Sequence, residues 1–322
     1  NSGHVRIYNY TPSGTASWTQ LGADIDGEAA GDQSGFSVSL SSDGSRVAIG
    51  AYANDGVSGS NSGHVRIYDY TPSGVTSWTQ VSGDIDGEAS DDQSGWSVSL
   101  SSDGSRVAIG ATLNDGNGTN SGHVRIYNYT PSGTASWTQL GADIDGEAAG
   151  DQSGRSVSLS SDGSRVAIGA YFNDGVSGSN SGHVRIYNYT PSGTASWTQL
   201  GADIDGEAAG DESGRSVSLS SDGSRVAIGA YNNDGVSGSA SGHVRVYSLS
   251  SGETYQYVWD VDGGGTPSNG TYYATVAAAD KAGNAYVAGT QSITFTLDTT
   301  APTVTLTNTD NNNKVNTSSV VT

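Results

Sequence analysis

A block of about 60 residues recurs along this chain and constrains its fold more than any other feature. A fixed period of this length indicates one supersecondary unit that is built repeatedly, and such units bury their apolar surface by stacking on one another. The fold therefore follows from the structure of one copy and from the packing between copies. The glycines that open successive copies lie 60, 59, 60 and 60 residues apart, at Gly3, Gly63, Gly122, Gly182 and Gly242.

One copy contains four short segments in which apolar and polar residues alternate. In the first copy these are residues 3–10, 17–21, 36–42 and 45–51. A period of two predicts strands, and no segment has the periodicity of a helix. The turn TPSG joins the first pair of strands, and the pair Asp43-Gly44 makes a tight hairpin between the last two. Each copy is therefore predicted to be a four-stranded antiparallel meander.

The order of strands in a meander also places the connections. The acidic loop 22–35 and the loop 54–63 must lie at one end of the sheet, and the short SSDG and TPSG turns at the other. A lone meander cannot cover both of its faces, whereas meanders stacked around an axis can, and that arrangement is a β-propeller. We expect an all-β propeller portion, with a linear array of meanders as the structural alternative.

The segment SGFSVSLSSDGSRVAIGA, with GHVRIY and SWTQL, resembles the FG-GAP repeat of integrin-type propellers, in its bacterial variety. The resemblance covers residues 1–248, and it implies a loop-rich face that binds ligands. Seven blades are usual in that family, so either further blades precede Asn1 or the ring is smaller. The Gly of the Phe-Gly pair is kept, but serine replaces its Phe, and Tyr or Thr replaces the Pro of Gly-Ala-Pro. The kept glycines are Gly35, Gly95, Gly154 and Gly214.

Beyond residue 248 the repeat ends and the sequence changes character. Residues 249–300 resemble bacterial Ig-like β-sandwich modules, on a Tyr-rich strand, the turn DKAGN and the joint DTTAP. Residues 301–322 read as the start of a second, truncated Ig-like module. Tandem modules of this kind imply a stalk, and we expect the chain to be a segment of a larger protein.

The strongly acidic composition narrows the possible partners. The net charge of -20 argues against binding a nucleic-acid backbone, which requires clustered Lys and Arg. The chain has no Cys, so neither disulfides nor thiol chemistry are available. No apolar run is long enough to span a membrane, and no signal peptide is visible.

Two positions per copy differ between copies although the rest of the repeat is nearly constant. They begin the third strand and follow the fourth, so they fall on the same rim as the acidic loops. An Arg at a dry core position would be costly, which indicates that these sites are partly solvated. We interpret them as a ligand-binding face, with drift at exposed loop ends as the alternative. The residues are Phe36, Trp96, Arg155, Arg215, Tyr52, Thr112, Tyr171 and Tyr231.

The acidic loops carry oxygen ligands at alternate positions, a pattern that suits Ca²⁺. The resemblance does not support this site, because integrin-type blades hold calcium in a different loop, where this chain has only SSDG. The alternative is that the aspartates cap turns through backbone N–H groups. The candidate ligands are Asp24, Asp26, Glu28, Asp32, Asp84, Asp86, Glu88, Asp92, Asp143, Asp145, Glu147, Asp151, Asp203, Asp205, Glu207 and Asp211.

Three further residue types recur once per copy. We interpret the histidines (His4, His64, His123, His183, His243) as structural residues between blades, because single histidines on separate blades show no metal-ligand spacing. The arginine two residues later, such as Arg66, is expected to lie against the tyrosine of its own strand and to neutralise a loop carboxylate. Trp18 is expected to be buried, so that Trp18→Ala would cost several kcal/mol.

These observations predict a non-enzymatic, extracellular or bacterial surface adhesion protein. Its propeller would display a multivalent face toward a protein or glycan on another surface, or toward copies of itself, and its Ig-like modules would be the stalk. The first alternative is a structural subunit or shaft segment of an extracellular filament. The second is a carbohydrate-active enzyme, which we consider least favoured, because Ser, His and Asp recur in every copy whereas an active site is usually asymmetric.

Overall fold

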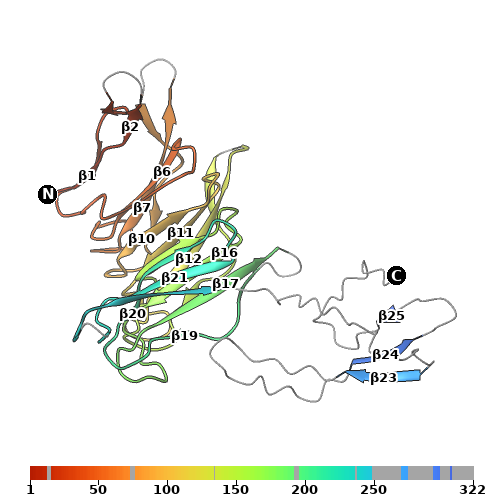
Figure 1. Ribbon diagram of the computed structural model, residues 1–322. Helices are drawn as coiled ribbons and strands as arrows, with labels where there is room; N and C mark the ends of the chain where they lie inside the picture. Colours follow the sequence, from red (N-terminus) through yellow and green to blue (C-terminus); the bar gives the residue numbers. More distant parts are fainter. Residues whose placement is uncertain are drawn as a thin grey trace. The chain divides into compact units, whose positions relative to one another are not determined.

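The computed structural model describes residues 1–12, 16–72, 77–133, 135–191, 196–235, 238–248, 270–274, 293–297 and 305–306. The chain divides into two units, Asn1–Leu249 and Ser250–Thr322, which are described separately. All regular structure in the described residues is β (Figure 1). Within them we find no helix with the length and apolar character needed to cross a membrane.

The first complete repeat forms one antiparallel sheet in the strand order β5-β6-β7-β8. Its strands are β5 (Ser37–Leu40), β6 (Arg46–Ala51), β7 (His64–Thr71) and β8 (Ser77–Gln80). A fifth short strand, β9 (Ile85–Asp86), pairs with the start of β7, where Val65 faces Ile85. The predicted four-stranded meander is therefore confirmed, and its last strand is divided into β8 and β9.

The same sheet recurs along the first unit. The second complete sheet contains β10 (Ser94–Leu100), β11 (Arg106–Ala111), β12 (His123–Thr130), β13 (Ser136–Gln139) and β14 (Ile144–Asp145). The third contains β15 (Ser156–Leu159), β16 (Arg165–Ala170), β17 (His183–Thr190), β18 (Ser196–Gln199) and β19 (Ile204–Asp205). A last sheet contains β20 (Ser213–Leu219), β21 (Arg225–Ala230) and β22 (His243–Ser248). At the N-terminus, β1 (His4–Val5) pairs with β4 (Ile25–Asp26), and β2 (Tyr8–Thr11) pairs with β3 (Ser17–Gln20).

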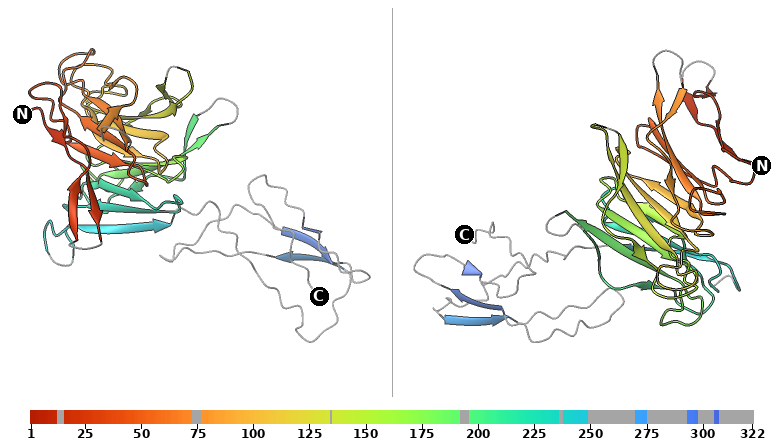
Figure 2. Two further views of the ribbon diagram at one scale, coloured as in Figure 1. Left: turned by 90° about the horizontal axis from the view of Figure 1, so that it is seen from above. Right: turned by 180° about the vertical axis from the view of Figure 1, so that it is seen from behind.

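The sheets stack face to face in sequence order, as blades (Figures 1 and 2). We call the side of a blade that faces the next blade its forward face, and the opposite side its rear face. Strand alternation divides each sheet between the two: Val124 and Ile126 of β12 lie forward, whereas Val107 and Ile109 of β11 lie to the rear. Each apolar core lies between two blades, so a complete blade is buried on both sides.

Polar contacts join neighbouring blades near their first strands. Ser39 Oγ accepts a hydrogen bond of 2.9 Å from the Leu100 amide of the next blade. A glycine in the second strand allows this approach, because the carbonyl oxygen of the kept Gly154 lies so close to Gly110 of β11 that a Cβ on Gly110 would collide with it. Gly154 itself has a φ of 85°, a left-handed conformation that favours glycine.

The acidic loop and the loop that precedes β7 meet at one rim, as the order of strands in the meander predicts. The amide of Asp91 donates to the Ser60 carbonyl at 2.8 Å, and the amide of Gln93 donates to the Asn61 carbonyl at 3.1 Å. The Asn61 side-chain amide also donates to Asp91 at 3.0 Å. We call this the loop rim.

The expectation that Trp18 is buried is wrong. Its side chain is 68% exposed, and it contacts Tyr10 of its own hairpin at a ring distance of 5.1 Å. The equivalent Trp78 is half-buried, packs against the preceding blade, and donates from its indole N–H to the Leu21 carbonyl at 2.8 Å. The indole is therefore buried by a preceding blade, and no such blade lies beside Trp18 in this chain.

In the second unit the structure describes one antiparallel sheet of β23 (Gly270–Ala274), β24 (Ile293–Leu297) and β25 (Thr305–Leu306). Most of residues 249–300 and 301–322 lies outside the described residues. The two Ig-like modules stay predictions.

Candidate functional site

The residues that vary between copies come together on the loop rim. They lie where the first strand of each sheet begins and the second ends, as at β5 and β6 of the first complete blade. Adjacent first strands pack against each other, so these positions form a row across successive blades. We call the row the aromatic-arginine stripe. It consists of Phe36, Tyr52, Trp96, Arg155, Tyr171, Arg215 and Tyr231.

The stripe is continuous from the first complete blade to the last sheet. Phe36, Tyr52 and Trp96 contact one another with ring centroids 4.6 to 4.8 Å apart. Arg155 lies between two rings, with its guanidinium carbon 4.5 Å from the centre of Trp96 and 5.2 Å from that of Tyr171. These distances fall within the range of cation–π attraction.

Arg215 extends the row to the last sheet. Its guanidinium carbon lies 5.3 Å from the Tyr171 ring and 4.1 Å from the Tyr231 ring. Unlike Arg155, it also forms an ion pair, at 3.1 Å with Glu212. Thr112 is the exception among the predicted residues, because it is 2% exposed and takes the place of a tyrosine without joining the row.

The residue just before each Ser-Gly pair supports the stripe from behind. Gln33 and Gln152 adopt positive φ values of 55° and 53°, and their side chains accept hydrogen bonds of 2.9 Å from the hydroxyls of Tyr52 and Tyr171. A left-handed conformation is uncommon for a residue with a side chain. The hydrogen bonds to these glutamines therefore hold the two rings in fixed orientations.

Burial among the rings alters the titration of the charged members. The pKa of Arg155 is lowered, first by desolvation and then by the nearby Arg215 charge. The pKa of the Tyr171 hydroxyl is raised by its burial. The Arg155 guanidinium forms no hydrogen bond or ion pair with another described residue, so its N–H donors are free for a partner.

The acidic loops do not gather their four carboxylates around one point. Asp92 accepts hydrogen bonds from the Ala89 amide at 2.9 Å and from the Asn114 side chain at 3.1 Å, which is the capping role weighed as the alternative. Asp32, Asp151 and Asp211 make the equivalent bonds to backbone amides. Among the described residues, no group of potential metal ligands is built from a single loop.

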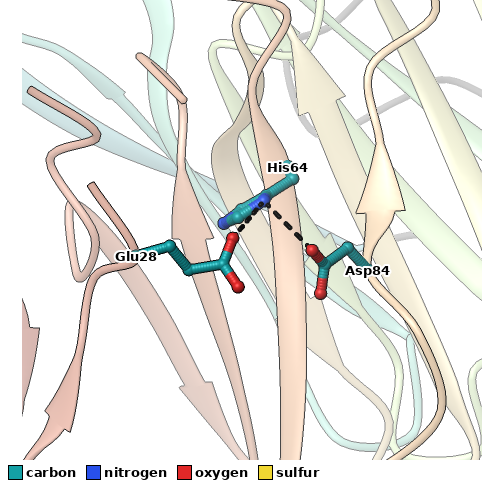
Figure 3. Close-up of side chains that lie close together, drawn as sticks. All are labelled: Glu28, His64 and Asp84. Atoms are coloured by element: carbon teal, nitrogen blue, oxygen red, sulfur yellow. Dashed lines mark ion pairs between the residues drawn. The ribbon is translucent and has the colours of Figure 1, made fainter. Parts of the chain in front are cut away.

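Instead, acidic residues of neighbouring blades meet around a histidine. Glu28 from one blade and His64 and Asp84 from the next form the first such cluster (Figure 3). Its counterparts are Glu88 with His123 and Asp143, and Glu147 with His183 and Asp203. In each cluster one ligand atom per residue lies within 4.8 Å of the other two, so these groups could hold a metal ion. We call them the inter-blade clusters.

His64, His123 and His183 are buried between blades, whereas His4 is exposed, and the closeness of the buried three to two carboxylates was not foreseen. His123 is 1% exposed, and burial lowers its pKa to about 4, with Arg125 contributing in the same direction. Burial also lowers the pKa of His183 to about 4. Both imidazoles are therefore neutral near pH 7. The signal in the sequence was the fixed spacing of Glu, His and Asp across the boundary between two copies.

The arginine prediction is confirmed at the same junctions. Arg66 lies 5.7 Å from the ring centre of Tyr68, and its guanidinium is 3.5 Å from Glu28 of the preceding blade. It also donates a hydrogen bond of 2.7 Å to the Asp26 carbonyl. Arg125 repeats these contacts with Tyr127, Glu88 and Asp86.

Comparison with known proteins identifies the class of repeat. The family model described as FG-GAP repeat matches residues 84–127 and 143–187, so the predicted FG-GAP resemblance is confirmed for these stretches. Each match runs from the end of one meander into the third strand of the next and includes a histidine of an inter-blade cluster. No curated protein matches the chain.

Several solved structures resemble the chain at low sequence identity. A putative 6-phosphogluconolactonase from Bacteroides uniformis is 14% identical, with 77% of this chain and 64% of that chain covered and a TM-score of 0.48. The Cps50 (Swd1) β-propeller domain of Myceliophteria thermophila is 10% identical, with 78% of this chain and 65% of that chain covered and a TM-score of 0.43. The periplasmic gluconolactonase PpgL of Pseudomonas aeruginosa is 13% identical, with 94% of this chain and 81% of that chain covered and a TM-score of 0.41. This chain thus spans slightly less than two thirds of the length of the first two.

Proposed function

We propose that this chain is a non-enzymatic interaction protein of the extracellular space or bacterial surface, and that it binds a protein partner through the aromatic-arginine stripe. The observation that carries the proposal is the continuity of the stripe across four blades. Trp, Tyr and Arg are the residues that most often dominate protein–protein binding energy. A row of them on one rim is a contact surface that no requirement of the fold explains.

The partner should present carboxylates beside apolar groups. Arg155 supplies guanidinium donors that are held flat between Trp96 and Tyr171, a geometry that suits a carboxylate. Phe36 and Tyr231, at the two ends of the row, are 48% and 47% exposed and add apolar area. The blades place similar contacts side by side, so a partner with a repeated motif gains avidity, which suits adhesion on an Ig-like stalk.

Panning a random peptide display library against the chain tests this function. We expect enriched peptides to combine acidic and aromatic residues. Their binding should weaken at least tenfold in Trp96→Ala and in Arg155→Ala. Trp18→Ala is the matched control, because it removes an equally large exposed aromatic ring away from the stripe and should leave binding unchanged.

A glycan array with the same variants separates the two classes of partner. If the stripe variants abolish binding to glycans while no peptide binds through the stripe, the partner is a glycan and the protein-partner proposal fails. Peptide binding that all three variants retain equally would place the contact surface elsewhere.

A specific observation also supports the structural alternative, a subunit of an extracellular filament. The rear face of the first complete blade exposes Val38 and Leu40, and the forward face of the last sheet exposes Val244 and Val246. At interior junctions these same two kinds of face pack against each other. The N-terminal strands β1 to β4 cover part of this rear face, so a second copy would dock its forward face on the part that they leave open, and an open head-to-tail contact of this kind generates filaments.

The oligomeric state decides this second candidate. Light scattering over a concentration series should reveal assemblies larger than a dimer, which Val246→Asp should disperse. A monomer at every concentration removes the filament proposal and leaves the stripe proposal untouched.

A further inference from the structure

The three inter-blade clusters share a histidine–glutamate contact, and in the first of them the aspartate also lies close to the histidine. His64 Nδ1 lies 3.9 Å from Glu28 Oε2 and 3.7 Å from Asp84 Oδ2. In the next two clusters the histidine Nδ1 lies 3.7 Å from the glutamate Oε2, in the pairs His123 with Glu88 and His183 with Glu147. These separations exceed hydrogen-bond distance, so the imidazole and the carboxylates face one another without bonding directly.

The imidazoles themselves point to a ligand. His64, His123 and His183 are each 1% exposed, and each has one buried ring nitrogen without a hydrogen-bond partner among the described residues: Nε2 in His64 and His183, and Nδ1 in His123. Leaving a buried polar atom unpaired is costly, and nearly all such atoms in folded proteins have a partner. In all three histidines Nδ1 is the nitrogen that faces the glutamate, and only in His123 is it also the buried unpaired one; Nδ1 is the nitrogen that a bound cation would engage (Figure 3).

The glutamate is held in the orientation that such a cation needs. Arg66 Nη1 lies 3.5 Å from Oε1 of Glu28, which leaves Oε2 of the same carboxylate facing His64. In the same way, Arg125 contacts Oε1 of Glu88 and Arg185 contacts Oε1 of Glu147, which leaves Oε2 of each glutamate facing its histidine. An arginine on one oxygen of a liganding carboxylate is a common outer support of metal sites.

We propose that each of the three inter-blade clusters binds one divalent transition-metal ion, with Zn²⁺ as the best-fitting ion, through one imidazole nitrogen and two carboxylates. Metal–ligand bonds of about 2.0–2.2 Å place neighbouring ligand atoms of a tetrahedral site about 3.4 Å apart. The histidine–glutamate separations exceed this by a few tenths of an ångström, whereas the ligand atoms of a whole cluster lie within 4.8 Å of one another, so closure requires the carboxylates to move toward the imidazole. A neutral imidazole with carboxylates suits zinc, whereas calcium takes oxygen ligands alone.

The ion would tie neighbouring blades together, because the glutamate comes from one blade and the other two ligands from the next. It would also balance charge, since each cluster places two carboxylates against one arginine. The proposed ion is therefore zinc held between residues of two blades, in place of the calcium ion that was considered within a single acidic loop.

The ends of the array provide internal controls. His4 and Asp24 occupy the positions of His64 and Asp84, but no glutamate of a preceding blade accompanies them. His243 pairs with Glu207 at 3.5 Å, and no third ligand completes that group among the described residues. Only three of the five histidines therefore belong to complete clusters.

Calorimetric titration of the EDTA-treated chain with ZnCl₂, in the presence of excess CaCl₂, tests the proposal. We expect three zinc ions to depend on the clusters: Asp84→Asn and His64→Gln should each lower the number bound by one. His4→Gln and Asp24→Asn should leave it unchanged. Asp84→Asn guards against misfolding, because it removes a ligand without altering a buried side chain.

A second measurement identifies the ligands without relying on stability. Co²⁺ added in place of zinc should give visible absorption bands, whose intensity falls by about one third in Asp84→Asn. Absence of zinc binding, displacement of zinc by calcium, or equal binding in Asp84→Asn and Asp24→Asn would each overturn the proposal. None of these outcomes bears on the stripe, which lies at other residues.

Discussion

The interior junctions and the two ends of the blade array contain the same residues in different surroundings. At the junction between the second and third complete blades, Val124 and Ile126 are 0% and 1% exposed. At the last sheet the equivalent Val244 and Val246 are 69% and 65% exposed. Trp18 at the N-terminal end is likewise exposed, whereas Trp197 packs against a core cluster.

The difference shows that a copy of this repeat does not bury its own apolar surface. Its cores form only between blades, so each junction stabilises two copies at once, as in other repeat proteins whose stability is a sum over neighbours. A given substitution should therefore have a large effect at an interior junction and a small one at an end. Matched pairs of variants test this expectation.

The tryptophan pair should give the largest difference. Trp197 donates a hydrogen bond of 2.7 Å to the Leu140 carbonyl of the preceding blade and packs on the core, so Trp197→Ala should lower the free energy of unfolding by about 3 kcal/mol. Trp18→Ala should lower it by less than about 1 kcal/mol. Urea denaturation followed by circular dichroism measures both. Equal losses would contradict the dependence on a neighbouring blade.

The buried histidines should make interior junctions sensitive to acid. The pKa of His123 falls from 6.5 to about 4 because its burial penalises the charged form. Below pH 6.5 the unfolded chain therefore binds a proton that the folded chain does not, and stability falls as the pH drops toward 4. The loss approaches roughly 3 kcal/mol for this group. The charges of Asp143 and Asp92 raise the pKa of His123, whereas the charge of Arg125 lowers it further.

Thermal unfolding between pH 7 and pH 5 in the presence of EDTA measures this slope. His123→Gln should make it shallower by about one third, because His64 and His183 also have lowered pKa values and stay in place. His4→Gln, at the exposed equivalent, should reproduce the wild-type slope. A slope that His123→Gln does not change would mean that other groups cause the acid sensitivity.

Much of the blade could be predicted from local pattern. Alternation fixed the strands, the pair Asp43-Gly44 fixed a hairpin, and meander order placed both long loops on one rim. The positions that vary between copies also converge, from Phe36 to Tyr231, because the period of the repeat puts equivalent positions side by side.

What could not be predicted depends on contacts between copies. The local sequence does not distinguish Trp197, which packs on a core, from Trp18, which is exposed, because both stand in the sequence SWTQL. The inter-blade clusters join residues 20 and 36 positions apart, Glu28 to His64 to Asp84, and a search for ligands within one loop cannot find them. Alternation places the serines of the first strand on one face but does not show that Ser39 and Ser99 accept hydrogen bonds from the next blade.

A valine pair isolates apolar burial from hydrogen bonding. Val124→Ala removes two methyl groups from a fully buried position between blades, and should cost about 2 kcal/mol including the cavity. Val244→Ala makes the same change at the exposed equivalent and should stay within about 0.5 kcal/mol of the parent. Urea denaturation again measures the pair, and a cost above about 1 kcal/mol for Val244→Ala would mean that another surface covers the last sheet in solution.

The smallest effect should come from the serines that join the blades. Ser99 Oγ accepts a hydrogen bond of 3.0 Å from the Leu159 amide of the next blade, and Ser99→Ala leaves that amide without its partner. The expected cost is about 1 kcal/mol, near the typical value for a lost hydrogen bond. Ser218→Ala is the matched control, because Ser218 holds the same position in the last sheet, is exposed, and bonds to no described residue. Hydrogen exchange at the Leu159 amide gives a direct local measurement, since it should accelerate in Ser99→Ala and not in Ser218→Ala. Unchanged exchange in both would mean that the blades are held by their apolar cores alone.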